Sequence, residues 1–185
     1  MVRTPTSCYA FIGHPLIRAA LGDRPSRDVH WIAPVAGGTR CAEIGSGGGF
    51  YTADLAAHLG SGSLLVALDP AAHDPRARRA VGPGATTVHV TGDGRALPFA
   101  SASLDALLFS YSLEEMSGPD VVLAEAGRVL RPGGQLVLFV WRPLTRRRIR
   151  SALAALTGDD GRPGAFVLVR ARRGLQNLRL AYRKR

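Results

Sequence analysis

The stretch "CAEIGSGGGFYT", residues 41–52, places an acidic residue just before a cluster of glycines. Glu43 precedes Gly45 by two positions, and Gly47 and Gly49 follow in alternation. Glycine loses more conformational freedom on folding than any other residue, so the cluster costs stability unless its backbone must bend tightly or approach a ligand closely. An apolar run precedes the glycines and a helical pattern follows them. A glycine turn between a strand and a helix predicts a site for a nucleotide or nucleoside.

The spacing of the glycines separates two classes of ligand. A dinucleotide-binding turn has the pattern GxGxxG. Counted from Gly45 the pattern ends on Phe50, and counted from Gly47 it ends on Thr52. Both counts fail, so the sequence does not predict a pyrophosphate cradle. An acid two positions before GxGxG remains, and it has to be explained together with the acids that follow along the chain.

Two further acids stand where apolar runs end. "LLVALDP" ends in Asp69 and Pro70, and Asp69 lies 20 residues beyond Gly49. A carboxylate at such a strand end can accept hydrogen bonds from both hydroxyls of a ribose. "TGDGRALPF" places Asp93 in a short turn after the next apolar run. The sequence therefore predicts three carboxylates near one edge of a sheet.

The elements that must position these residues follow from the apolar pattern. Short apolar runs without strict alternation, separated by helical stretches, predict a parallel sheet covered by helices. The first helix should follow the glycines and end at Gly60, and residues 119–130 should form another. The five predicted strands are residues 40–44, 63–68, 86–90, 104–110 and 135–141. The predicted buried stripe of the first helix is Ala53, Leu55, Ala56 and Leu59.

The two ends of the chain read differently from this core. Residues 1–39 predict two short helices, near 14–21 and 27–33, that cap one side of the site. After Trp141 we expect a helix with Ile149, Leu153 and Leu156 on one face, then two strands joined at Gly174 as an antiparallel hairpin at the sheet edge. We interpret residues 1–185 as a single domain, with a helical cap (1–39), a ligand-binding core (40–141) and a basic helix and edge hairpin (142–185).

Five ordered blocks resemble the class I S-adenosylmethionine-dependent methyltransferases. They are the acid-and-glycine block, "LLVALDP", "TGDGRALPF", "SLDALLFSYSLEEM" and "LAEAGRVLRPGGQLVLF", and together they cover about residues 40–141. The sequence looks most similar to the small-substrate branch that includes quinone-biosynthesis C-methyltransferases. The resemblance implies an α/β, Rossmann-like fold of seven strands, mostly parallel with an antiparallel C-terminal edge strand and helices on both faces. It also implies S-adenosylmethionine as cofactor.

The resemblance implies a role for each block in holding the cofactor. Glu43 would help to hold the glycine loop and the methionine ammonium group. Asp69 would bind the ribose and Asp93 the adenine ring. Ser110, Tyr111 and Ser112 would flank the sulfonium. The predicted cofactor-binding set is Glu43, Gly45, Ser46, Gly47, Gly49, Asp69, Pro70, Gly92, Asp93, Gly94, Ser110 and Tyr111.

The sequence departs from the family in two places. The block after the second strand is "PAAHDPRARRAVGPGA", which is broken by proline and glycine where relatives carry a full helix. Many relatives have histidine where Glu115 stands. Glu115 could act as a general base if burial raised its pKa, and His14 or Tyr111 could accept or relay a proton. Methyl transfer is largely a matter of alignment, so a dedicated base need not exist.

The charge is concentrated at the C-terminal end. Residues 142–185 carry a net charge of +11, whereas residues 1–141 carry −1. An arginine-rich tail suits RNA or an anionic membrane surface, and it also suits a solvated edge strand. Three hypotheses remain open: a methyltransferase for a small organic acceptor, an RNA- or ribosome-directed methyltransferase, and a cofactor-binding regulator without catalysis.

Composition narrows the remaining classes. Cys8 and Cys41 lack the spacing of a zinc site, so we expect no metal. The sequence has no apolar run long enough to span a bilayer, and residues 1–18 lack the apolar core of a signal peptide. We therefore expect a cytoplasmic protein whose partner is a small molecule.

Overall fold

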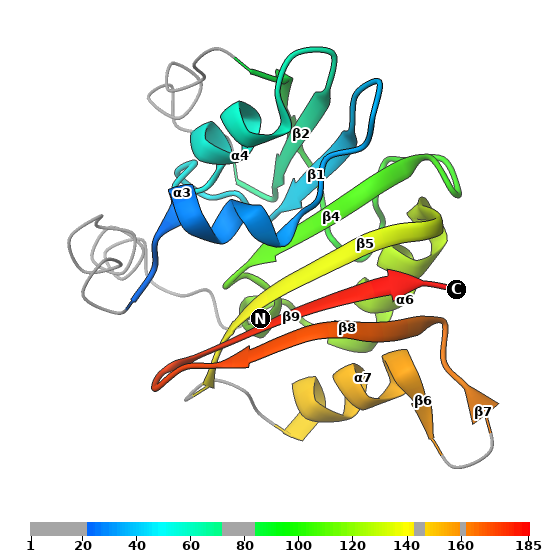
Figure 1. Cartoon of the computed structure of the whole chain (residues 1–185). Helices are drawn as coiled ribbons and strands as arrows, with labels where there is room; N and C mark the ends of the chain where they lie inside the picture. The colour runs from blue at the N-terminus through cyan, green and yellow to red at the C-terminus, as the bar shows by residue number, and fades with distance from the viewer. Residues whose placement is uncertain (1–21, 72–83, 143–146, 160–161) are drawn as a thin grey trace.

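The computed structural model describes residues 22–71, 84–142, 147–159 and 162–185. Within them, strands and helices alternate along the first two thirds of the chain and a strand hairpin ends it (Figure 1). The helices are α3 (Pro25–Asp28), η1 (Val29–Trp31, a 3-10 helix), α4 (Thr52–Leu59), η2 (Leu113–Glu115, also 3-10), α6 (Pro119–Val129) and α7 (Arg147–Thr157). The strands are β1 (Arg40–Ile44), β2 (Leu64–Asp69), β3 (Thr86–Thr91), β4 (Leu104–Ser110), β5 (Leu130–Trp141), β6 (Gly158–Asp159), β7 (Arg162–Pro163), β8 (Phe166–Arg173) and β9 (Asn177–Lys184).

Seven of the strands form one mixed sheet in the order β3-β2-β1-β4-β5-β9-β8. Strands β1 to β5 are parallel, and β9 runs antiparallel to β5 and to β8. The predicted α/β fold and the antiparallel C-terminal hairpin are therefore confirmed. β8 lies at the free edge, and β9 is inserted between it and β5.

The strand order reverses between β1 and β4, which are neighbours in the sheet. Connections from β1 lead toward β2 and β3 on one side, and β4 and β5 follow on the other side. At such a switch point the loops diverge and leave a crevice at the carboxyl ends of the strands. The glycine loop follows β1 at this point and therefore lies where an open α/β sheet binds its ligands.

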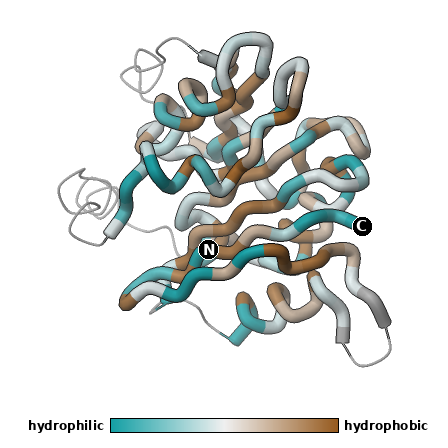
Figure 2. Tube along the Cα trace, viewed as in Figure 1, coloured by the Kyte–Doolittle hydropathy of each residue, from teal (hydrophilic) through white to brown (hydrophobic). Residues whose placement is uncertain are grey.

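Helices cover both faces of the sheet, as predicted. α3 and α4 lie on one face and α6 and α7 on the other (Figure 1). Each face has its own apolar core: Tyr51, Leu55 and Phe139 are buried on the α4 side, and Leu123 and Ile149 on the α6 and α7 side. Figure 2 shows the hydrophobic residues concentrated along the central strands.

Three local predictions differ from the structure. β5 begins at Leu130, because Leu130 pairs with Leu104 and Gln135 pairs with Ala106, so the expected "RPGG" turn is a bulge within the strand. The predicted helix near 27–33 is two short turns, α3 and η1; the one near 14–21 lies outside the described residues. Ala53 is only half-buried, and Thr52 takes its place in the buried face of α4.

Candidate functional site

The glycine loop after β1 is held against the end of β2. The backbone N–H groups of Gly45 and Ser46 both donate to the carbonyl oxygen of Leu68, at 2.7 and 3.1 Å. Gly45 has φ = +74°, and a Cβ on it would lie 2.4 Å from the Cβ of Ser112. Only glycine fits this position, because any side chain would collide with the segment that follows β4.

Glu43 lies beneath this loop and is fully buried. Its Oε2 accepts a hydrogen bond from the Thr52 hydroxyl at 2.6 Å, and its Oε1 accepts one from the Ser110 hydroxyl at 3.2 Å. The carboxylate thus joins β1 to the start of α4 and to the end of β4. The sequence singled out Glu43 and Ser110 but missed Thr52, whose signal was a hydroxyl at the first turn of the helix after the glycines.

Asp69 faces the other side of the glycine loop. Its Oδ2 accepts a hydrogen bond from the backbone N–H of Gly47 at 2.8 Å, and its Oδ1 accepts one from the N–H of Ala71 at 2.9 Å. Each carboxylate oxygen has a second lone pair that can accept a further donor. Pro70, beside it, is exposed. Asp69 therefore both shapes the loop and presents acceptors at the carboxyl edge of the sheet.

Asp93 stands in the turn after β3, where the structure pairs it with Arg95. The guanidinium donates from Nε and Nη2 to the carboxylate, with the shortest contact at 2.6 Å, and the Arg95 N–H donates to Oδ1. This hydrogen bonding lowers the pKa of Asp93 below its usual value. The pair is half exposed, with the Asp93 side chain 48% accessible. The carboxylate is ionised and open to a ligand, and Arg95 shares it.

A methionine that the sequence analysis did not select lies between the two glycine turns. A Cβ on Gly94 would stand 3.1 Å from the Met116 sulfur, and a Cβ on Gly45 would stand 3.4 Å from its methyl group. Met116 is partly buried beside the core that includes Ile44. Its unbranched thioether forms an adaptable apolar wall between the turns after β1 and β3. Gly92 lies against Leu68.

The three predicted residues at the end of β4, Ser110, Tyr111 and Ser112, have side chains that point in different directions. Ser110 donates to Glu43, and Ser112 donates to the carbonyl oxygen of Ile44 at 2.6 Å. Tyr111 has φ = 59°, an unusual backbone conformation for a bulky residue. Its hydroxyl donates to Asp23 at 2.5 Å. Through this hydrogen bond the hydroxyl faces residues 22–31, which we call the N-terminal segment, and the Tyr111 ring itself is buried.

Asp23 belongs to a buried polar cluster that also escaped the sequence analysis. Arg179 of β9 donates to Asp28 at 2.8 Å and lies 3.8 Å from Asp23. Tyr51, at the end of the glycine loop, donates to Asp28 at 3.2 Å. We call Asp23, Asp28, Tyr51, Tyr111 and Arg179 the cap cluster. It ties the N-terminal segment to the loops that follow β1 and β4.

Of the three predicted catalytic residues, the structure describes Glu115 and Tyr111. Glu115 lies in η2 and is exposed, so the burial that the general-base hypothesis requires is absent. The neighbouring Glu114 is turned inward and accepts a hydrogen bond from the N–H of Trp141. Tyr111 donates to Asp23, as described above. His14 lies outside the described residues, and its role stays a prediction.

The part of the chain that the structure describes offers little support for a cysteine nucleophile, a metal site or a membrane-spanning helix. Burial raises the pKa of the Cys41 thiol far above its usual range, so the thiolate nucleophile is suppressed. Among the described residues, no group of three or more histidine, cysteine, aspartate or glutamate side chains could hold a metal ion. None of the described helices has the length and apolar character needed to cross a bilayer.

The geometry leaves space for a ligand over the glycine loop. Side chains added at Gly47 or Gly48 would meet no atom of the described residues within 4 Å, and Gly47 has φ = +52°. Three carboxylates stand toward this edge of the sheet: Glu43 near the end of β1, Asp69 at the end of β2, and Asp93 in the turn after β3. Such an edge suits a ligand that offers several hydrogen-bond donors and carries positive charge.

A family model described as "Methyltransferase domain" matches residues 42–138, more than half of the chain. A malonyl-[acyl-carrier protein] O-methyltransferase from Methylococcus capsulatus is 33% identical over 120 residues, which are 64% of this chain and 43% of that protein. A demethylmenaquinone methyltransferase from a Parafrankia species is 38% identical over 78 residues, which are 40% of this chain and 31% of that protein. The chain therefore spans less than half the length of either relative.

Solved structures with the same fold match over nearly the whole chain. A SAM-dependent methyltransferase from Aquifex aeolicus aligns with a TM-score of 0.72 at 16% identity, covering 99% of this chain and 100% of that one. A 1,6-didemethyltoxoflavin-N1-methyltransferase from Burkholderia thailandensis, solved with S-adenosylhomocysteine, aligns with a TM-score of 0.64 at 19% identity, covering 96% and 86%. At these identities the likeness concerns the fold.

Proposed function

The chain belongs to the methyltransferase-domain family, and from this premise we propose that it transfers the methyl group of S-adenosylmethionine to a small organic acceptor. The observation that carries the proposal is the set of three carboxylates around the glycine loop, at the switch point of the sheet. Glu43 lies in β1, Asp69 ends β2, and Asp93 follows β3. The residues that we propose to hold the cofactor stand on four separate segments of the chain: β1 with its glycine loop, the end of β2, the turn after β3 and the end of β4.

The donor set of S-adenosylmethionine fits these acceptors. The cofactor offers an ammonium group, two ribose hydroxyls and an adenine amino group, and it carries a positive charge at sulfur. In the proposed arrangement Asp69 accepts from the ribose and Asp93 from the adenine amino group. Glu43 acts from below the loop, where it holds Thr52 and Ser110 and contributes negative charge. Met116 provides the apolar wall beside the adenosine.

Bound S-adenosylmethionine would supply a methyl group attached to a sulfonium. The neutral thioether that remains after transfer is a good leaving group. The role of the chain is then to bind, align and exclude water, and alignment alone can contribute several orders of magnitude in rate. Ser110 and the backbone of Tyr111 stand at the end of β4, beside the glycine loop. The acceptor would approach from the side of the N-terminal segment, which the cap cluster holds in place.

A small organic acceptor is supported by the relatives that share sequence with this chain. The names of these relatives refer to demethylmenaquinone and to malonyl groups on an acyl-carrier protein. The basic C-terminal region gives less support to RNA than its charge suggests, because part of that charge is used inside the protein. Arg179 pairs with Asp28, Arg142 donates to the carbonyl oxygens of Gly174 and Leu175, and Lys184 donates to Leu130.

Labelled cofactor tests the proposal directly. We expect that cell extract incubated with the protein and methyl-labelled S-adenosylmethionine yields label in a small-molecule fraction. Asp69→Ala should abolish the labelling, and Asp120→Asn, an exposed acid on α6, should retain it. Label confined to nuclease-sensitive material would instead favour an RNA-directed enzyme. Cofactor binding without any labelled product would favour a regulator. We propose the cytoplasm as the compartment in which such an acceptor is met.

A further inference from the structure

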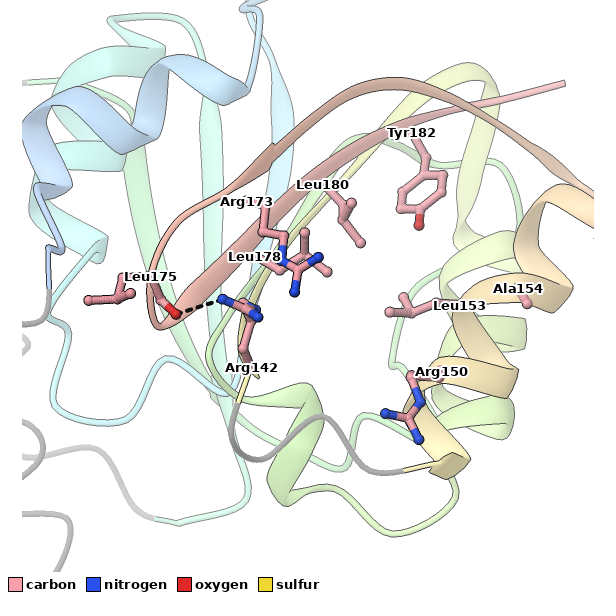
Figure 3. A pocket seen from close by; sticks show the side chains of 9 residues that line it. All are labelled: Arg142, Arg150, Leu153, Ala154, Arg173, Leu175, Leu178, Leu180 and Tyr182. Carbon is pink, nitrogen blue, oxygen red and sulfur yellow. Dashed lines mark hydrogen bonds between the residues drawn. The ribbon is translucent and has the colours of Figure 1, made fainter.

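A groove on the far side of the sheet from α3 is not part of the site described above. It lies between α7 and the β8–β9 hairpin and has a volume of about 750 Å³ (Figure 3). Its floor is apolar: Leu178 and Leu180 from β9 face Leu153 from α7. From its chemistry we propose that this groove binds a monomeric anionic amphiphile, a carboxylic acid with an apolar chain. The proposal goes beyond methyl transfer and does not depend on it.

The apolar floor follows from the alternation of side chains along β9. Leu178, Leu180 and Tyr182 point toward α7, whereas Arg179 and Ala181 point to the opposite face. Leu153 reaches the groove from α7, where it is only partly buried, although the helix buries Ile149 beside it. From Leu178 to Tyr182 the strand extends roughly 14 Å, which is the length of an extended chain of about ten carbons.

The rim of the groove is cationic. Arg173 on β8 and Arg142, just after β5, line it on the side of the hairpin, and Arg150 lines it from α7 (Figure 3). None of the described residues that line it is acidic. Arg142 is fixed by its hydrogen bonds to the hairpin turn, at 3.1 and 2.7 Å. The side chains of Arg150 and Arg173 have no ion pair or hydrogen bond with another described residue. Their guanidinium groups are therefore available to a carboxylate.

A phenol stands at the other end of the groove. The Tyr182 ring is buried against Phe166, and its hydroxyl points toward α7 in Figure 3. Burial raises the pKa of Tyr182 to about 12, so the hydroxyl stays protonated. The hydroxyl makes no hydrogen bond with the residues that the structure describes. The groove therefore combines an apolar floor, a cationic rim and a polar far end, which suits a chain with an acidic head.

Calorimetric titration with sodium decanoate, below the concentration at which it forms micelles, tests the proposal. We expect one decanoate per chain, and about tenfold weaker binding when Arg150→Gln and Arg173→Gln are combined, since a charge-assisted contact to each guanidinium is lost. Arg172→Gln is the matched control, because Arg172 neighbours Arg173 on the strand but points to the opposite face. It should leave the affinity unchanged. Thermal melting of each variant checks that the fold is retained.

Two probes separate the contributions of chain and charge. Decyltrimethylammonium has the same chain with a cationic head, and acetate has the same head without the chain. Neither should give a binding signal at concentrations that saturate decanoate. The proposal is overturned if decanoate fails to bind, if the double variant binds it as tightly as the wild type, or if either probe binds equally well. Binding to anionic phosphatidylglycerol vesicles without binding of monomeric decanoate would also overturn it, in favour of membrane docking.

Discussion

At the scale of single residues, the positions in and around the glycine loop differ in their roles: some are needed for the backbone conformation and others for binding a ligand. Gly45 is required by both its backbone angle and its lack of a side chain, because Ser112 fills the adjacent space. Gly48 has no such neighbour among the described residues. Asp69 fixes the backbone of Gly47 and is also the acceptor proposed for the ribose. Substitutions at these positions should therefore separate stability from ligand binding.

We expect Gly45→Ala to destabilise the fold and Gly48→Ala to leave its stability nearly unchanged. Alanine at position 45 must adopt φ = +74° and its Cβ must displace Ser112. The free energy of unfolding should therefore fall by about 2 kcal/mol or more. Alanine at position 48 meets no atom within 4 Å in the part of the chain that the structure describes. The change there should stay within about 0.5 kcal/mol. Chemical denaturation measures both, and equal losses would contradict this account of the loop.

Some properties of single residues could be predicted from the sequence and others could not. The places of Glu43, Asp69 and Asp93 at the ends of strands could be predicted, because each stands near the end of an apolar run. The carboxyl ends of parallel strands share one edge of the sheet. The direction of the Tyr111 side chain could not be predicted, because it depends on Asp23, 88 residues away in the chain. The exposure of Glu115 depends on the short 3-10 turn that places Glu114 inward instead.

At the scale of elements, α6 holds the loop that joins the Asp93 turn to β4. Glu125 accepts a hydrogen bond from the N–H of Leu97 at 2.8 Å, and Arg128 donates to the carbonyl oxygens of Leu97 and Phe99 at 3.0 and 2.8 Å. Arg128 also donates to Glu125 at 2.6 Å. The helix thus fixes the end of "TGDGRALPF" through its polar face.

This arrangement predicts a pH-dependent contribution to stability. Hydrogen bonding from Arg128 lowers the pKa of Glu125 below its usual value of 4.5. The contribution is therefore fully present above that usual value and is lost as pH falls through the lowered folded-state pKa. We expect Glu125→Gln to cost about 1 kcal/mol at neutral pH, and the difference from wild type to shrink as pH falls through the lowered folded-state pKa.

Urea denaturation of the wild type and of Glu125→Gln, at neutral and at acidic pH, measures this difference in the free energy of unfolding. Asp120→Asn, on the exposed side of the same helix, serves as the control and should differ little from wild type at either pH. A penalty for Glu125→Gln that persists undiminished at low pH would show that Glu125 acts by packing alone.

Most of the strands and helices could be predicted from the sequence. All five core strands and the C-terminal hairpin were predicted, since buried parallel strands are short apolar runs and the helices between them have a different period. The extra residues at the start of β5 were not, because the "RPGG" segment is a turn by composition and joins the strand only through the pairing of Leu130 with Leu104. Long-range pairing of this kind leaves no local signal.

At the scale of the whole molecule, the cap cluster connects the two ends of the described chain. Arg179 of β9 pairs with Asp28, which is 151 positions earlier, and donates to the carbonyl oxygen of Gly22 at 3.2 Å. Both the Arg179 and Asp28 side chains are almost inaccessible to solvent. One arginine of the basic tail therefore fastens the N-terminal segment over the crevice, a role that the charge of the tail did not suggest.

We expect Arg179→Met to loosen this segment and destabilise the fold. Removing the cation leaves buried carboxylates without their partner, which typically costs about 3–5 kcal/mol. Brief trypsin digestion should then cut after Arg27, since the Arg24–Pro25 bond resists trypsin, and denaturation should give the lost stability. Arg172→Met, on the exposed strand β8, is the control. If the two variants resist trypsin and urea equally, the cluster does not hold the segment.

The central claim is that the crevice above the glycine loop holds S-adenosylmethionine. Calorimetric titration of the protein with the cofactor or its demethylated product tests this claim most directly. The account predicts one equivalent bound with an affinity on the order of micromolar, and at least about tenfold weaker binding for Asp69→Ala with its melting transition retained. Absence of binding by the wild type, or an unchanged affinity for Asp69→Ala, would contradict the account.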